Sequence, residues 1–98
     1  MSMLMAIEAK KNYMLRQREQ ERTTLRDIAQ VVSIDYAEKA ANILDHRKHS
    51  YSFEGYLGLL SELQRLIVAG LEPELALDAV QTGWTAESIL NLWRYQNE

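Results

Sequence analysis

The chain of 98 residues contains no cysteine, a single proline (Pro73) and no glycine before Gly55. The absence of cysteine excludes disulfide bonds and thiolate metal sites. No apolar run approaches the roughly 20 residues that a membrane-spanning helix needs. The apolar residues near the N-terminus precede Lys10 and Lys11, whereas a secretory signal peptide places its basic residues first. We therefore expect a cytoplasmic protein that does not enter a membrane.

Charge is distributed unevenly along the chain, although the formal net charge is only -3. Residues 1–50 carry nine Lys and Arg against seven Asp and Glu, a balance of +2. Residues 51–98 carry two against seven, a balance of -5. The overall charge does not suggest nonspecific adhesion to nucleic acid or to an anionic membrane. The sequence instead predicts a basic N-terminal half and an acidic C-terminal half.

The sequence predicts an all-α fold, because helix-forming residues are abundant and β-branched residues never alternate with polar ones. A first helix is expected over residues 3–20, on a thin apolar stripe that includes Ile7 and Met14. The polar stretch that follows interrupts this stripe. Thr24-Leu25-Arg26-Asp27 resembles a capping box, in which the threonine hydroxyl accepts from the first free backbone amides. A second helix is therefore expected over residues 24–46.

The expected helix 24–46 has an apolar face wider than one neighbour can cover. Its apolar positions, three and four residues apart, are Leu25, Ile28, Ala29, Val32, Tyr36, Ala40 and Ile43. At about 35 Å this helix is also longer than the helices expected after it. We therefore expect residues 1–48 to form a helical arm, with a homodimer formed through residues 24–46.

A compact three-helix bundle is expected over residues 49–98, sharing one continuous core with the arm. Ser52 can cap a helix that ends near Ala69, and Gly70 suits the left-handed residue after its end. Pro73 suits the first turn of a helix over 73–81, with Leu75, Ala76, Ala79 and Val80 facing inward. After a turn at residues 82–84, Thr85 is expected to cap a last helix packed through Ile89, Leu90, Leu92 and Trp93.

The bundle resembles the ubiquitin-associated (UBA-like) three-helix fold over about a third of the chain. Ala69-Gly70-Leu71 resembles its loop, Ala76 to Val80 its second helix, and Ile89-Leu90 with Trp93 its third. The connection before the third helix is about one residue short. Ala69 and Leu71 also replace the methionine and the aromatic that would touch ubiquitin. The resemblance therefore implies the fold more than ubiquitin binding.

Two stretches also resemble the helix-turn-helix of DNA-binding proteins. In the first, Ala79, Gly83 and Ile89 match the small residue, turn glycine and buried aliphatic. Its recognition helix would offer Arg94 as the only basic residue, which makes it a poor reader of DNA. In the second, which starts at Leu25, Ser33 replaces the turn glycine and Lys39 stands where an aliphatic is expected.

No catalytic, cofactor or metal motif is recognisable. His46 and His49, three residues apart and next to Asp45, suit a solvated helix end better than a metal site, because no further histidine completes a ligand set. An acidic collar of Glu72, Glu74, Asp78 and Glu87 suits solvated surface near helix N-termini better than acid–base chemistry. We therefore expect no enzyme activity and no cofactor.

Two sets of residues are candidates for partner contact. A basic set can be a solvated helix face or can contact an acidic protein or nucleic acid: Lys10, Lys11, Arg16, Arg18, Arg22 and Arg26. At the corners of the bundle stand Leu71, Pro73 and Trp84, and tryptophan is common at binding hot spots. The sequence favours a small non-enzymatic regulator, adaptor or inhibitor that binds another macromolecule, most simply a protein. A helix-turn-helix DNA-binding regulator that uses the basic half is the alternative.

Overall fold

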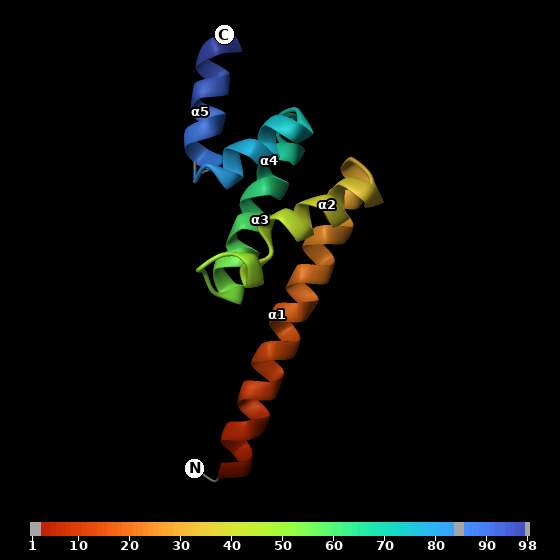
Figure 1. The fold of residues 1–98 in the computed structure, drawn as a ribbon, viewed down its shortest axis with the longest axis vertical. Coiled ribbons are helices and arrows are strands. Elements are labelled where there is room, and N and C mark those ends of the chain that lie inside the picture. The colour runs from red at the N-terminus through yellow and green to blue at the C-terminus, as the bar shows by residue number, and fades with distance from the viewer. Residues whose placement is uncertain (1–2, 84–85, 98) are drawn as a thin grey trace.

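The computed structural model describes the backbone of residues 3–83 and 86–97, and the side chains of residues 7–83, 87–92, 94 and 95. Within these ranges the chain forms helices and no strands, which confirms the all-α prediction (Figure 1). In chain order the elements are α1 (Met3–Val31), α2 (Ile34–Leu44), the short 3-10 helix η1 (His46–Lys48), α3 (Phe53–Val68), α4 (Pro73–Gln81) and α5 (Ala86–Asn97).

Helix α3 is the centre of the fold and contacts every other element. Its inward face carries three leucines with no exposed surface, Leu60, Leu63 and Leu66. Ile28 from α1, four side chains of α2 and four of α4 join them in one cluster of buried residues. Burial of this apolar surface supplies the main free energy that holds the helices together.

Helix α1 is longer than the sequence predicted, and it ends where a continuous helix was expected. Helix-forming residues carry α1 through Thr24, whose side chain is buried within the helix rather than capping one. The expected helix 24–46 is divided at Ser33, which adopts an extended backbone and accepts a hydrogen bond from the Tyr36 amide (3.0 Å). The N-terminal cap predicted at Thr24 is therefore wrong, and the cap of α2 is Ser33, nine residues later.

The division at Ser33 turns the apolar face of residues 24–46 back onto the chain's own core. Ile28, Tyr36 and Ala40 are all buried there. Much of the apolar surface that led us to expect a homodimer is thus already covered within one chain. The homodimer itself stays a prediction.

The corner between α3 and α4 forms as the sequence predicted. Gly70 has φ of +100°, which favours glycine. Its amide donates to the Ile67 carbonyl (3.0 Å), and the Leu71 amide donates to the Leu66 carbonyl (3.1 Å), the hydrogen bonds of a Schellman motif. Pro73 begins α4, and Ser52 caps α3.

Within α4 the inward face is rotated relative to the prediction. Ala76, Ala79 and Val80 are buried as expected. Leu77 is also buried, whereas Leu75 is 54% exposed. The prediction for Leu75 was wrong because apolar residues lie around most of this nine-residue helix, and contact with α3 decides which of them face inward.

Two contacts join α2 to α4. The Tyr36 hydroxyl donates to the Pro73 carbonyl (2.5 Å), and Lys39 Nζ pairs with Glu74 Oε2 (2.9 Å). Burial, and then the Glu74 and Glu72 carboxylates, raise the pKa of Tyr36 from 10.0 to about 12. The neutral phenol is therefore part of the folded structure well into the alkaline range.

The molecule is elongated, with extents of 58 × 25 × 23 Å. The C-terminal half of α1 packs against the other helices, while the N-terminal half of α1 extends away from them (Figure 1). The described side chains of this projecting part, residues 7–16, are all exposed.

Replacing Ser33 with alanine is expected to lower the free energy of unfolding by about 1 kcal/mol, because α2 loses its N-terminal cap. Urea denaturation followed by circular dichroism measures this change. Ser50→Ala, at an exposed position outside the helices, is the control and should change stability by less than about 0.5 kcal/mol. Equal stability of the Ser33 variant and the wild type would contradict the cap.

Tyr36→Phe is expected to cost about 1 kcal/mol at pH 7, because the hydrogen bond to Pro73 is lost. A phenol whose folded pKa is raised above 10.0 stabilises the fold fully below pH 10 and loses that contribution as pH rises toward 12. The stability gap between wild type and variant should therefore narrow between pH 10 and pH 12 in denaturation experiments. An unchanged gap would contradict this role, and Tyr95→Phe, at an 81% exposed residue, is the control.

Candidate binding surface along the first helix

One face of α1 carries side chains at alternating spacings of four and three residues over its described length, and the pattern continues to the residue directly after the helix. We call these positions the α1 seam: Ile7, Lys11, Met14, Arg18, Glu21, Leu25, Ile28 and Val32. Apolar residues at an average spacing of 3.5 are the pattern by which one helix packs lengthwise against another, and five of these eight positions are apolar. The α1 seam is therefore a surface suited to a helical neighbour.

The chain covers only the C-terminal half of the α1 seam. Ile28 is completely buried, and Leu25 and Val32 pack against the same core. In the N-terminal half, Ile7 is 59% and Met14 47% exposed. The chain's own core thus covers the C-terminal end of the seam, and no described residue covers the apolar side chains at its N-terminal end.

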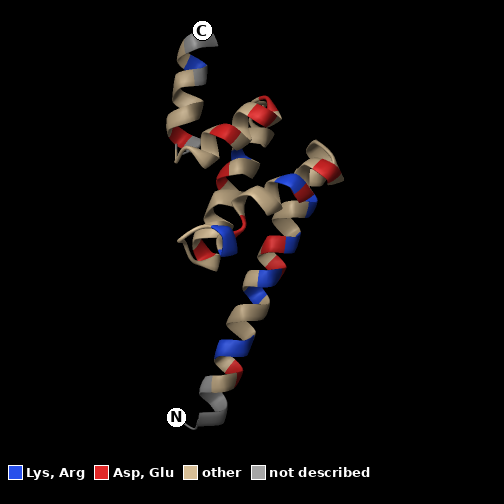
Figure 2. Ribbon diagram, viewed as in Figure 1, with Lys and Arg blue, Asp and Glu red and all other residues tan. Residues whose placement is uncertain are grey.

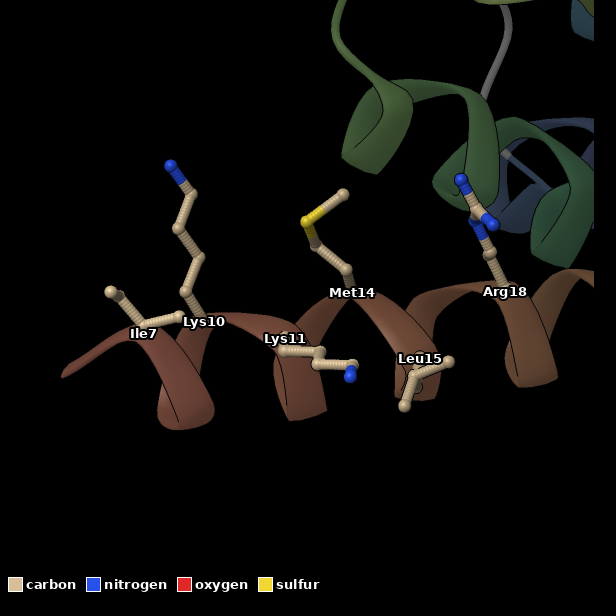
Figure 3. Close-up of a pocket in the computed structure, with 6 residues that line it drawn as sticks. All are labelled: Ile7, Lys10, Lys11, Met14, Leu15 and Arg18. Atoms are coloured by element: carbon tan, nitrogen blue, oxygen red, sulfur yellow. The ribbon is translucent and has the colours of Figure 1, made fainter. Parts of the chain in front are cut away.

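The open half of the seam is apolar at its base and basic at its edges. Six residues of α1 line a cavity of about 390 Å³: Ile7, Lys10, Lys11, Met14, Leu15 and Arg18 (Figure 3). In Figure 3, Met14 and Arg18 project to the same side of α1. Among the described side chains, three cations and no carboxylate line this cavity, so it suits a partner that is both apolar and acidic.

All six basic residues that the sequence singled out lie exposed on α1 (Figure 2). Among the described residues, Arg22 alone of the six forms an ion pair, with Glu19 Oε2 at 3.8 Å. Lys10, Lys11 and Arg18 line the cavity. Arg16 instead lines a separate cavity, which also includes Glu54. The structure therefore groups part of the basic set around one apolar surface.

The cavity continues toward the bundle as a groove. A second cavity, of about 280 Å³, shares Met14 and Arg18 with the first and adds His46 and Phe53. A third, of about 310 Å³, shares His46 and Phe53 with the second and reaches Glu21. Because neighbouring cavities share lining residues, the three lie in sequence from the open half of the seam to the junction of α1 with η1 and α3, and we call them together the α1 groove.

Aromatic rings form the floor of the α1 groove where it meets the bundle. The His46 and Phe53 rings lie edge to face with centroids 5.3 Å apart, and Phe53 and Tyr56 are 5.6 Å apart. His46 comes from η1 and the other two from the start of α3. Sequence reasoning missed this floor, because it depends on how α1 crosses η1 and α3.

The inner end of the groove is acidic, at Glu21 and Asp45. Hydrogen bonds from Arg47, with Nη2 2.8 Å from Asp45 Oδ2, lower the pKa of Asp45 from 3.8 to about 2. Burial, followed by a hydrogen bond to the Glu21 carboxylate, raises the pKa of Tyr56. Arg47 pairs with Asp45 and also interacts with Glu21, so the two carboxylates and one guanidinium leave this end with one net negative charge, which we assign to Glu21.

Polar contacts between side chains also join α1 to α3 and its first turn. The Tyr13 hydroxyl donates to the Glu54 carboxylate, and Gln64 Nε2 donates to Asp27 Oδ2 (2.9 Å). Tyr13 also accepts from Gln17 Nε2 (3.1 Å). These contacts lie beside the seam, so they position α1 without covering its open half.

The other proposed contact residues fare differently. Leu71 is only 5% exposed, because it is the apolar residue that packs inward after the Schellman motif. Its side chain therefore cannot form the contact surface that the sequence suggested. Pro73 is half-buried and its carbonyl accepts from Tyr36. Trp84 lies outside the described residues, as does the side chain of Trp93.

Two carboxylates of the acidic collar, and the histidine His49, have structural partners. The Glu72 carboxylate caps α4, accepting from the Leu75 amide (2.9 Å), and Glu74 pairs with Lys39. His49 Nε2 lies 2.9 Å from the Ile43 carbonyl oxygen. In the described part of the chain, no group of three or more His, Asp or Glu side chains is placed to hold a metal ion.

No helix in the described residues combines the length and apolar character needed to cross a membrane. Comparison with protein-family models, with curated proteins and with solved structures gave no match to this chain. The function must therefore be inferred from the surface itself.

Hydrogen exchange is expected to divide α1 into two parts. Amides of residues 8–12 should exchange far faster than those of residues 24–31, because only the latter are held by tertiary packing. Exchange followed by NMR on dilute protein measures this difference. Equal protection along α1 would contradict it and would show that something, such as a second copy, covers the open half.

Proposed function

We propose that this protein is a non-enzymatic regulator or adaptor that binds an acidic, partly apolar surface of another protein through the open half of the α1 seam. The observation that carries this proposal is a helix-packing repeat that is buried at Ile28 and exposed at Ile7 and Met14. A surface patterned for a neighbouring helix and left uncovered is typical of helix-in-groove recognition.

The charges around the open half favour an acidic partner. Lys10, Lys11 and Arg18 surround its apolar residues, and opposite charges across an interface speed association and select partners. A symmetric pairing of two α1 helices along this half would bring Lys11 and Arg18 of both copies together. The homodimer was predicted through residues 24–46, so this charge repulsion does not bear on it.

DNA binding remains the second candidate. Helices α1 and α2 meet at Ser33, the position where a helix-turn-helix would turn, and α1 is basic. Phosphate contacts supply most nonspecific affinity, yet α2 carries Asp35 and Glu38, and its Lys39 is paired with Glu74. An apolar cavity between the cations of α1 also fits a protein surface better than a phosphate backbone.

Two further predictions belong with this proposal. The resemblance of the C-terminal bundle to the UBA-like fold remains a prediction, supported by the Gly70 corner and by buried Ala76 and Ala79. A cytoplasmic location is likewise proposed. Neither is required for binding through α1, which depends only on the exposed face described above.

Binding to a defined acidic helix tests the proposal. A 16-residue helical peptide with leucines on one face and glutamates beside them should bind the full chain in fluorescence anisotropy at 50 mM salt. Lys10→Gln with Lys11→Gln should weaken binding about 2- to 30-fold, as expected for the loss of two exposed ion pairs.

Arg65→Gln with Arg94→Gln provides the control, because it removes the same charge from exposed residues of other helices. This control should change affinity less than twofold. No peptide binding, or equal losses in both double variants, would refute the proposal. Tighter binding to mixed-sequence DNA, with affinity falling steeply as salt rises, would favour the second candidate.

A further inference from the structure

The α1 seam consists of two positions that each recur every seven residues, and the residue types at these positions differ between its covered and open halves. One position is occupied in turn by Lys11, Arg18, Leu25 and Val32, and the other by Ile7, Met14, Glu21 and Ile28. Where the chain covers its own seam, both positions are aliphatic. Before Leu25 the first position is basic, and the second is apolar at Ile7 and Met14 and acidic at Glu21. A neighbour on this part of the seam therefore needs complementary charges at fixed places.

The charge in the α1 groove reverses along its length. Lys10, Lys11 and Arg18 surround the outer cavity, while Glu21 carries the net negative charge at the inner end. A uniformly acidic partner would meet Glu21 unfavourably, and a basic partner would meet the three cations unfavourably. A partner with acidic residues at one end and a basic residue at the other satisfies both ends.

Between the two ends the groove offers apolar contact at Met14 and Phe53. These two line its middle cavity, of about 280 Å³, together with the polar side chains of Gln17, Arg18 and His46. An apolar side chain that enters there is removed from water on both sides, which is the arrangement that gives an interface its central affinity. The charged ends then fix the direction in which the partner lies.

We infer that the α1 groove binds one amphipathic helix of a partner protein, with acidic residues over Lys11 and Arg18, an apolar side chain between Met14 and Phe53, and a basic residue at Glu21. From Ile7 to Glu21 the groove follows about 21 Å of α1, which matches about four turns of a partner helix. This occupant rests on the proposed function, and it adds the secondary structure and charge order of the ligand.

Three synthetic helical peptides of 16 residues test this occupant on the full-length chain by fluorescence anisotropy. The first has glutamates spaced to lie over Lys11 and Arg18, leucines between them and a lysine pair at the end that lies over Glu21. The second has the same composition with glutamates and lysines interleaved, and the third replaces the lysines with glutamates. We expect the first to bind about two- to fivefold more tightly than the second, since correct placement adds about one exposed ion pair.

The substitution Glu21→Gln is expected to change the affinity of the first (segregated) peptide and of the third (all-acidic) peptide in opposite directions. It should weaken binding of the segregated peptide about two- to fivefold and strengthen binding of the all-acidic peptide, because it removes an attraction in one case and a repulsion in the other. The amide side chain introduced by this substitution keeps an acceptor for Tyr56, and thermal denaturation checks that the fold is intact. Glu38→Gln, on the exposed face of α2, should change neither affinity.

The outcomes separate the occupant from the proposed function. If the segregated and interleaved peptides bind equally and Glu21→Gln changes nothing, the charge order is wrong while binding of acidic helices stands. If no acidic peptide binds, both fail. Binding of anionic lipid vesicles or DNA in preference to every peptide would also overturn both.

Discussion

The structure depends on a difference in length between its first and its central helix. Helix α1 has 29 residues and spans about 44 Å, whereas α3 has 16 residues and spans about 24 Å. Every other helix packs on α3, so the core can extend only as far as α3 reaches. About half of α1 must therefore lie outside the bundle, and the chemistry of that half decides what the protein can bind.

The repeat along α1 connects the core to this projecting half. Leu25 and Val32 occupy one seam position in the covered part, and Lys11 and Arg18 occupy the same position in the open part. Aliphatic residues throughout would have left a long apolar face prone to pairing with itself. The cations keep the packing pattern, disfavour a second copy of the same face and favour an acidic neighbour. Stability and selectivity are thus assigned to different halves of one helix.

Local signals in the sequence predicted the corner between α3 and α4 well, because the residues themselves determine the backbone there. Gly70 supplies a positive φ and Pro73 a first helical turn, whatever surrounds them. The start of a helix at Thr24 was wrong, because a capping pattern also fits inside a helix when strong helix formers precede it. The exposure of Leu75 could not be predicted either, since it depends on the face that α4 presents to α3.

The candidate site was only partly visible in the sequence. The basic residues of α1 were evident from composition alone, and Ile7 and Met14 were recognised as a thin stripe. The aromatic floor at His46 and Phe53 was not, because these residues are about 30 positions or more from Met14 and are brought near it only by the crossing of α1 over η1 and α3. Leu71 was taken for surface because a corner residue and a buried Schellman residue have the same sequence context.

The central claim, that the open half of the α1 seam is the binding surface, is tested most directly by NMR chemical-shift mapping. The segregated peptide would be titrated into methyl-labelled protein. The account predicts that the methyl signals of Ile7, Met14 and Leu15 shift together, while those of Val68 and Leu75, exposed on other helices, stay in place. Shifts concentrated on Val68 and Leu75, with Ile7 and Met14 unchanged, would contradict it.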